Sequence, residues 1–521
     1  MNQPVFVRHK KAVIPAALIL TAVWLVVSVF AGRGIFVFPE RSDSAFLLAA
    51  SDYVICRILS TLVMFAVSHA ISRIIFSRDE TRTGLLCVIK YGLIYLPVLA
   101  GVLFIKLPAG FLSNDEYAIV NDAVNLIHDT WFTYLTVYYY IISFMLIPAK
   151  YGPIFVKVII EFFVAGYTVC RSTSYFGKKP GLIMYALFLM YPVIAYTTSA
   201  HRLPVYFLIY LALFVKLLFD RLESRKISPG GVFFILLAGA VLTQWRTEGI
   251  YLLALVPIFL FIVYPNLRSK KSVAAVIASY VILQFIIAVP QNFITAESVS
   301  GQANDRMKPF YAYTITNMLR NGLDRDRNAH DLSVVDRYIS LESIDAISEH
   351  FGDINYEDVL ILTKEEFSGV RPEAGYTEYF EFSEAVKRIF VNNPDVFLRT
   401  RWGAFCYAAV PFPFALAPSG LKSLAYNLFI PTAFVLLALL YCLIKKRWFD
   451  FFVFGGLACH WLIVFILAPA SYFKYYFPVY IMAYFYMFMI LTGFVSRKTG
   501  SVQTGSSAAQ ASDMRSGEGA S

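Results

Sequence analysis

Two adjacent carboxylates, Asp115 and Glu116, follow a long apolar stretch in a sequence of 521 residues of which only 15% are charged. At a lipid–water boundary, a carboxylate has the chemistry to take a proton from an incoming sugar hydroxyl. Residues 113–116 also fit the start of a helix, so the local sequence leaves a catalytic role and an N-cap role both open. Asp115 and Glu116 are the candidate catalytic residues, with Tyr117 as a candidate substrate-lining residue.

Three other positions place a cation beside aromatic or small residues where charge is not needed to orient the chain. Their polar side chains are His201, Arg202, Arg246, Glu248, Tyr472 and Lys474. Basic residues on the outer side oppose the positive-inside bias, and charge-assisted hydrogen bonds to a phosphate would account for them. The four basic residues are therefore candidates for binding a donor phosphate, and Glu248 and Tyr472 for lining the substrate. Snorkelling towards headgroups and a surface Arg246–Glu248 pair remain the alternatives.

Three ionisable residues fall inside apolar stretches: Lys157, Glu161 and His460. An intramembrane ionisable residue is a functional hypothesis by default. Lys157 and Glu161 are four residues apart on one predicted helix, however, so they are also placed to pair with each other. For His460 we favour a hydrogen-bonded packing role. No metal-binding motif is present.

The composition identifies lipid as the main solvent of the chain. Hydrophobic residues make up 58% of the sequence and the mean hydropathy is +0.62, well above soluble domains. The net charge of +10 comes from short basic runs between apolar stretches, which is typical of cytoplasmic loops and does not indicate nucleic-acid binding. The six cysteines lack metal-ligand or redox spacing and are interpreted as small hydrophobes. The first apolar stretch lacks a cleavage site and is expected to remain as a helix.

Apolar stretches of about 20 residues, the length needed to cross a bilayer core of about 30 Å, recur along the chain. Oriented by flanking charge, they predict about twelve transmembrane helices with both termini cytoplasmic. The predicted spans are residues 13–31, 53–76, 85–105, 153–175, 181–198, 203–219, 232–245, 250–264, 273–289, 424–444, 451–468 and 475–495. Residues 131–148 are crowded with tyrosines and are expected to lie at the outer surface. Residues 402–418 are interrupted by prolines and are expected to be interfacial or re-entrant.

The predicted fold class is an all-α polytopic membrane protein with interfacial helices and one large extracytoplasmic loop domain. The predicted regions are N-terminal membrane helices (1–106), a first outer loop with the acidic motif and interfacial helix (107–152), membrane helices (153–290), an extracytoplasmic domain with an interfacial segment (291–418), C-terminal membrane helices (419–496) and a cytoplasmic tail (497–521). The tail is rich in Ser, Gly and Ala, a composition typical of disorder.

This layout and its motifs resemble the GT-C superfamily of polyprenyl-phosphate-dependent glycosyltransferases, which includes protein O-mannosyltransferases and aminoarabinose transferases. Residues 114–116 match the acidic motif in that family's first outer loop. Residues 246–249 resemble its Arg-x-Glu-Gly element, and residues 470–478 look like a late segment in which an Arg-Tyr pair often precedes a proline. The sequence departs from the family by having two spans before the acidic loop. It also has His201-Arg202 where many members carry an acidic residue, which leaves metal dependence open.

The resemblance implies an inverting membrane glycosyltransferase that takes a sugar from a polyprenyl-phosphate-linked donor. The acceptor would be a cell-surface glycan, lipid or protein at the outer face of the cell membrane, and no cofactor is predicted. Asp115 would activate the acceptor with help from Glu116, while Arg202, Arg246 and Lys474 would hold the lipid-linked phosphate. An O-antigen-type polymerase that uses outer-loop arginines is the alternative. A lipid-linked sugar transporter or flippase is less favoured because charges within the predicted spans are sparse.

Overall fold

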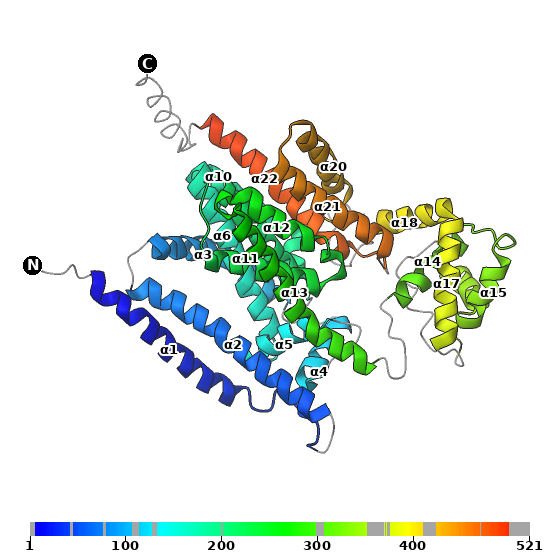
Figure 1. The fold of residues 1–521 in the computed structure, drawn as a ribbon, viewed down its shortest axis with the longest axis horizontal. Coiled ribbons are helices and arrows are strands. Elements are labelled where there is room, and N and C mark those ends of the chain that lie inside the picture. The colour runs from blue at the N-terminus through cyan, green and yellow to red at the C-terminus, as the bar shows by residue number, and fades with distance from the viewer. Residues whose placement is uncertain are drawn as a thin grey trace, which may run out of the picture. The chain divides into compact units, whose positions relative to one another are not determined.

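The computed structural model describes residues 6–41, 45–76, 80–106, 114–127, 133–199, 202–298, 307–351, 369, 371, 376–409, 424–468 and 470–499. Every regular element in this part of the chain is a helix (Figure 1). Eight helices are long and apolar enough to cross a membrane, or nine if one bent pair forms a single span. The chain is therefore a multi-pass α-helical membrane protein, but the described residues contain fewer full-length spans than the sequence predicts.

Most of the difference comes from three apolar stretches that were predicted as spans but form helices too short to cross a bilayer. They are α11 (Pro229–Trp245), α12 (Leu252–Val263) and α20 (Phe429–Ile444). The 16 residues of α20 cover about 24 Å, less than the bilayer core of about 30 Å. Helix α5 (Tyr134–Leu146) has 13 residues and is also too short to span, in keeping with its predicted interfacial position.

The structure divides into two compact units, and the first contains Met1–Ile127, Val137–Glu223 and Ile481–Ser521. Its first two helices, α1 (Phe6–Ala31) and α2 (Ala45–Phe76), lie side by side as a hairpin (Figure 1). The buried residues of α2 are small or polar and recur at helical spacing: Ala49, Asp52, Cys56, Ser60, Ser68 and Ser72. Small side chains let membrane helices pack closely, and the apolar side chains exposed on both helices suit contact with lipid.

Helices α3 (Glu80–Lys106) and α6 (Gly152–Phe176) pack antiparallel in the first unit. Their closest approach is at Gly92 and Gly166, where a Cβ atom on Gly166 would collide with the Val88 carbonyl oxygen. Only glycine permits this separation of the two backbones. The antiparallel crossing therefore sets which residues of α3 and α6 face each other.

This crossing corrects the interpretation of two cysteines. Cys87 on α3 and Cys170 on α6 form a disulfide, although the sequence analysis treated all six cysteines as small hydrophobes. The two residues are 83 positions apart and belong to no spacing motif, so only helix packing brings them together. The remaining four cysteines are free: Cys56, Cys406, Cys442 and Cys459.

The predicted span at residues 181–198 is a bent helical pair. The segments Lys178–Leu189 and Tyr191–Thr197 meet at 61°, with the extended residue Met190 between them. Pro192 lies in the first turn of α9 (Tyr191–Thr197), a position where proline favours the start of a new helix. Helix α10 (Leu203–Leu222) follows, and most of its residues are buried.

The second unit contains His128–Thr136 and Ser224–Tyr480, and α5 and α22 (Phe477–Lys498) contribute residues to both units. Its apolar helices are α11, α12, α13 (Lys270–Ser298), α20 and α21 (Trp448–Leu467), of which α13 and α21 are long enough to span a membrane. Residues 402–409, where the predicted interfacial segment begins, are the last turns of α18 (Pro394–Ala409). Residues 410–423 lie outside the described part, as does the tail beyond residue 499.

The described part of the predicted extracytoplasmic region folds as a helical domain (Figure 1). Its helices are α14 (Lys308–Arg320), α15 (Ala329–Tyr338), α16 (Leu341–Phe351), α17 (Tyr376–Asn392) and α18. Phe310, Ile315, Val335, Phe382 and Ile389 belong to its buried core. The predicted boundary at residue 291 falls inside α13, which continues to Ser298.

Candidate functional site

The acidic motif forms the first turn of α4 (Asn114–Asn125) in the first unit. The side chain of Asp115 lies outside the described part of the structure. Glu116 has only 1% of its surface exposed, whereas Tyr117 is 60% exposed. The helix-start interpretation is therefore correct for the backbone, and the buried carboxylate of Glu116 is the one whose surroundings the structure describes.

Glu116 belongs to a group of ionisable side chains in which Lys157 and Glu161 are also buried, whereas Lys106 and Arg202 are partly buried. Its carboxylate acts electrostatically on Lys157 of α6 and on Tyr140 of α5, and Arg202, just before α10, acts on the same tyrosine. Lys157 also lies within the electrostatic influence of Lys106 and Glu161. We refer to Lys106, Glu116, Lys157, Glu161 and Arg202 as the buried cluster. The structure thus brings two predicted site residues that are far apart in sequence, Glu116 and Arg202, into a common electrostatic environment.

Lys157 and Glu161 have partners beyond each other. Lys157 Nζ donates a hydrogen bond to the Ser199 carbonyl oxygen, and the Tyr95 hydroxyl lies 2.8 Å from Glu161 Oε1. Both charged side chains are almost completely buried, at 1% and 0% exposed. The spacing of four residues suggested that Lys157 and Glu161 pair only with each other along α6. The structure shows that each also has a hydrogen-bond partner on another part of the chain.

The lysines of the buried cluster meet the carboxyl end of the bent pair. Lys106 Nζ, at the last residue of α3, donates to the Ala195 carbonyl oxygen at 2.9 Å, and Lys157 reaches Ser199 just beyond α9. Carbonyl groups at a helix C-terminus lack intrahelical donors and carry partial negative charge. These contacts give the lysines a structural role and at the same time gather positive charge beside Glu116.

In the second unit, Arg246 and Glu248 form a two-point ion pair. Arg246 Nε is 3.1 Å from Glu248 Oε2, and an Arg246 terminal nitrogen is 2.5 Å from Oε1. Each side chain is 13% exposed. Burial acts to raise the pKa of Glu248, but the charge and hydrogen bonds of Arg246 outweigh it and lower that pKa to about 2. The surface pair considered in the sequence analysis is therefore a largely buried one.

Aromatic and basic residues from other helices surround this pair. His460 of α21 acts electrostatically on Glu248, and its Nε2 lies 2.9 Å from the Tyr475 carbonyl oxygen. The Arg246 guanidinium lies 5.5 Å from the centre of the Tyr475 ring. The predicted hydrogen-bonded role of His460 is confirmed. We refer to Arg246, Glu248, His460 and Tyr475 as the Arg246 cluster.

Lys474 and Tyr472 lie next to the Arg246 cluster. Lys474 Nζ is 4.5 Å from the centre of the Tyr472 ring and 5.9 Å from that of Tyr475. The η7 turn, Phe473–Tyr476, presents these residues before α22. Arg246 and Lys474, which are 228 positions apart in sequence, thus share Tyr475 as a neighbour.

Each group of predicted residues assembles within its own unit. Glu116, Tyr117 and Arg202 are in the first, whereas Arg246, Glu248, Tyr472 and Lys474 are in the second. His201 lies outside the described residues. Lys106 was missed because a lysine at the end of a span looks like an ordinary interfacial anchor.

Arg401 was also missed as an individual residue and is among the most buried side chains, at 1% exposed. Its Nε donates to the Phe465 carbonyl oxygen at 2.6 Å, and a terminal nitrogen donates to that of Ala468 at 3.0 Å. It thereby caps the carboxyl end of α21. Arg399 and Arg401 flank Thr400 directly before Trp402, but nothing in this sequence distinguishes the buried arginine from the exposed one.

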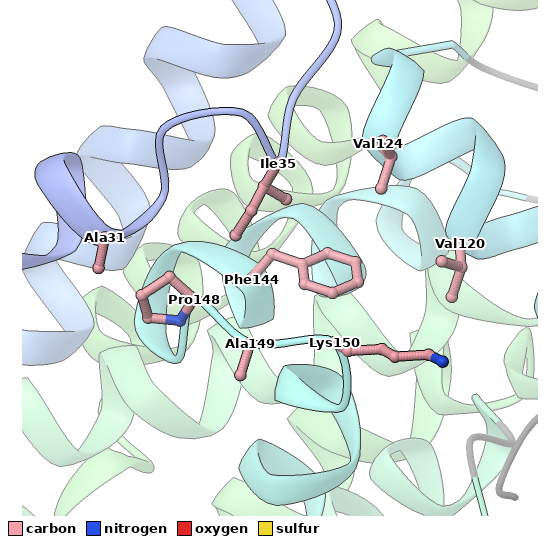
Figure 2. Close-up of a pocket in the computed structure, with 8 residues that line it drawn as sticks. All are labelled: Ala31, Ile35, Val120, Val124, Phe144, Pro148, Ala149 and Lys150. Atoms are coloured by element: carbon pink, nitrogen blue, oxygen red, sulfur yellow. The ribbon is translucent and has the colours of Figure 1, made fainter.

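A hollow of about 330 Å³ lies beside α4 in the first unit (Figure 2). Figure 2 shows Val120 and Val124 of α4 on one side and Phe144 and Pro148 on another. Lys150 is the single charged residue among those lining it. The lining suits an apolar chain better than a sugar, and it includes none of the predicted site residues.

Among the described residues, no group of three or more His, Cys, Asp or Glu side chains is arranged to hold a metal ion. The described chemistry is that of carboxylates held beside cations: a carboxylate can accept a proton, and cations can bind a phosphate. Comparisons with known proteins identify no relative, since no family model, no curated protein and no solved structure matches the chain.

Proposed function

We propose that the chain is a membrane glycosyltransferase that moves a sugar from a polyprenyl-phosphate-linked donor to a glycan, lipid or protein at the outer face of the cell membrane. The observation that carries the proposal is the position of Glu116. This carboxylate follows the third membrane helix, is buried, and acts electrostatically on Lys157. Both Glu116 and Arg202 act electrostatically on Tyr140. A carboxylate next to several cations supports both proton removal and phosphate binding.

In the proposed reaction, an acceptor hydroxyl oxygen bonds to the anomeric carbon of the donor sugar as the bond from that carbon to the phosphate oxygen breaks. Glu116 or its neighbour Asp115 takes the hydroxyl proton, and the polyprenyl phosphate leaves with the bonding electrons. Arg202 is the proposed phosphate ligand in the first unit. Arg246 and Lys474 keep this role as a proposal for the second unit, where both lie beside Tyr475.

The test compares Glu116→Gln, Asp115→Asn and a control, Asn121→Ala, an exposed position on the same helix. Membranes containing each full-length variant receive a panel of polyprenyl-phosphate monosaccharides labelled in the sugar. We expect Glu116→Gln or Asp115→Asn to reduce release of polyprenyl phosphate about 10²–10⁴-fold, because a general base contributes that much. Unchanged release in both carboxylate variants, at equal protein abundance, would overturn the proposal.

The polymerase alternative relies on outer-loop arginines, and the described arginines of the helical domain argue against it. Four of them form ion pairs with carboxylates of the same domain: Arg325 with Asp345, Arg337 with Glu381, Arg371 with Asp336 and Arg388 with Asp331. These ion pairs explain the four arginines as structural residues of the domain, without a role in substrate binding. A polymerase would still lose activity when they are replaced by alanine, whereas the proposed transferase would keep it.

One feature favours a transporter as the second candidate. Transporters use broken membrane helices whose exposed backbone groups bind ions or substrates. Helix α9 follows a 61° bend and ends beside the buried Lys157 and the partly buried Lys106. A transporter would move the labelled donor across vesicles with its sugar–phosphate bond intact. The same labelled panel therefore separates the two functions by whether that bond is cleaved.

A further inference from the structure

One edge of α18 exposes apolar side chains, whereas another face of the helix is buried. Val396, Thr400 and Ala404 are buried at a spacing of four, which marks the inner face. Leu398 and Trp402 are also four apart and are each 51% exposed. Residues at this spacing project from the same side of a helix, so the two side chains form one continuous exposed edge.

The position of α18 is set by its contacts with a membrane helix. Arg401 donates hydrogen bonds to the carbonyl oxygens of Phe465 and Ala468, where α21 ends. On the side of the helical domain, Asn321 Nδ2 donates to Thr400 Oγ1 at 3.0 Å. Helix α18 therefore lies at the end of a membrane span and connects that span to the helical domain.

The exposed edge continues into a lipid-facing surface. The Trp402 ring centre is 6.3 Å from that of Phe429, the first residue of α20. Further along α20, Ile430 is 46% exposed and Leu437 is 68% exposed, as expected for a helix face in contact with lipid. The edge of α18 is thus adjacent to the apolar surface that the membrane must cover.

The charges on the hairpin of α20 and α21 indicate which membrane surface this is. The turn between these helices carries three consecutive basic residues, 445–447, which the positive-inside bias assigns to the cytoplasm. Because α20 begins and α21 ends at the opposite end of the hairpin, α18 lies at the outer surface. Arg399, an exposed residue next to Leu398, is then placed among lipid phosphates.

We propose that the edge of α18 formed by Leu398, Arg399 and Trp402 inserts into the outer lipid–water interface of the bilayer. Tryptophan is enriched at this depth because its ring is apolar and its N–H remains hydrated, and a neighbouring leucine adds buried apolar surface. The helical domain is then held against the membrane by α18 itself. The partner is the lipid surface, and the inference does not depend on the proposed sugar transfer.

Site-directed spin labelling of the full chain in phospholipid vesicles tests the proposal. The free cysteines, Cys56, Cys406, Cys442 and Cys459, are replaced by alanine, and single cysteines are introduced as Leu398→Cys or Trp402→Cys. Ile430→Cys, on the exposed face of α20, is the lipid-facing reference. Asp326→Cys, at an exposed turn of the helical domain, is the aqueous reference. Collisions with oxygen report lipid, and collisions with a water-soluble nickel chelate report water.

We expect labels at positions 398 and 402 to show a several-fold higher ratio of oxygen to nickel accessibility than the label at 326, approaching the ratio at 430. Agreement of both positions with 326 would overturn the proposal, because the edge would face water. Low accessibility to both reagents would overturn it too, since protein would then cover the edge. Because Leu398→Cys retains Trp402, the test remains decisive if the tryptophan variant does not fold.

Discussion

The two clusters place carboxylates beside cations by different means. In the buried cluster, Glu116 and Lys157 come from separate helices and are each 1% exposed. In the Arg246 cluster, Arg246 and Glu248 are two residues apart, pair directly and are each 13% exposed. The buried cluster depends on the packing of whole helices, whereas Arg246 and Glu248 are brought together by their proximity in the sequence. We therefore expect the first to be the more sensitive to loss of one charge.

The largest effect is expected for Lys157→Ala in the buried cluster. Removing one member of a buried charge network leaves its partners desolvated and uncompensated, at a cost of about 3–5 kcal/mol. The apparent melting temperature of the purified protein in detergent should therefore fall markedly. The matched control is Lys216→Ala, because Lys216 pairs with Asp220 at 2.6 Å but is 36% exposed. Partly exposed pairs contribute less than about 1 kcal/mol.

If Lys157→Ala and Lys216→Ala melt at the same temperature, the stability of the buried cluster does not depend on its charges, and the contrast between buried and exposed pairs is wrong.

A double variant tests the role of charge compensation in the buried cluster. Replacing Lys157 and Glu161 together by methionine removes a cation and a carboxylate at once. This double change should destabilise less than the sum of the two single changes, because joint apolar replacement avoids an uncompensated buried charge.

An intermediate, pH-dependent effect is expected for Glu248→Gln. The pKa of Glu248 is lowered from 4.5 to about 2, so the folded state binds this proton less readily than the unfolded state. Its stabilising contribution, up to about 3 kcal/mol, is present above pH 4.5 and is lost as the pH falls towards 2. Melting temperatures of wild type and variant should therefore differ near neutral pH and converge on acidification. A difference that persists at the lowest pH would contradict an ionic role for Glu248.

The smallest effect on stability is expected for Lys474→Gln beside the Arg246 cluster. A partly exposed cation over an aromatic ring contributes about 0.5–1 kcal/mol, so the melting temperature should change little. Sugar transfer should decline more clearly, because the variant lacks a proposed phosphate ligand. Lys474→Arg retains the charge and should preserve more of the transfer. Equal transfer by all three proteins would remove Lys474 from the proposed site.

Many of the membrane helices could be predicted, because the bilayer thickness sets the minimum length of a transmembrane helix and apolar stretches of that length are visible in the sequence. The predicted spans at 13–31, 85–105 and 153–175 fall within the helices Lys11–Ala31, Arg82–Lys106 and Gly152–Phe176. Hydropathy also predicted spans at the stretches that form α11, α12 and α20, although these helices are shorter than a bilayer core requires. Hydropathy also could not predict the 61° bend at Met190, because the helices on both sides of it are apolar.

The sequence by itself determined that this chain resides in a membrane, and it singled out Glu116, Arg202, Arg246 and Lys474 as residues whose charge required an explanation. It also contained the Arg246–Glu248 pair, because partners two residues apart meet through local geometry. Only the tertiary structure decided that Glu116 lies beside Lys157 and that Arg401 caps α21. The physical reason is that the neighbours of a buried charge are selected by helix packing, through contacts such as Gly92 with Gly166 that no local pattern encodes.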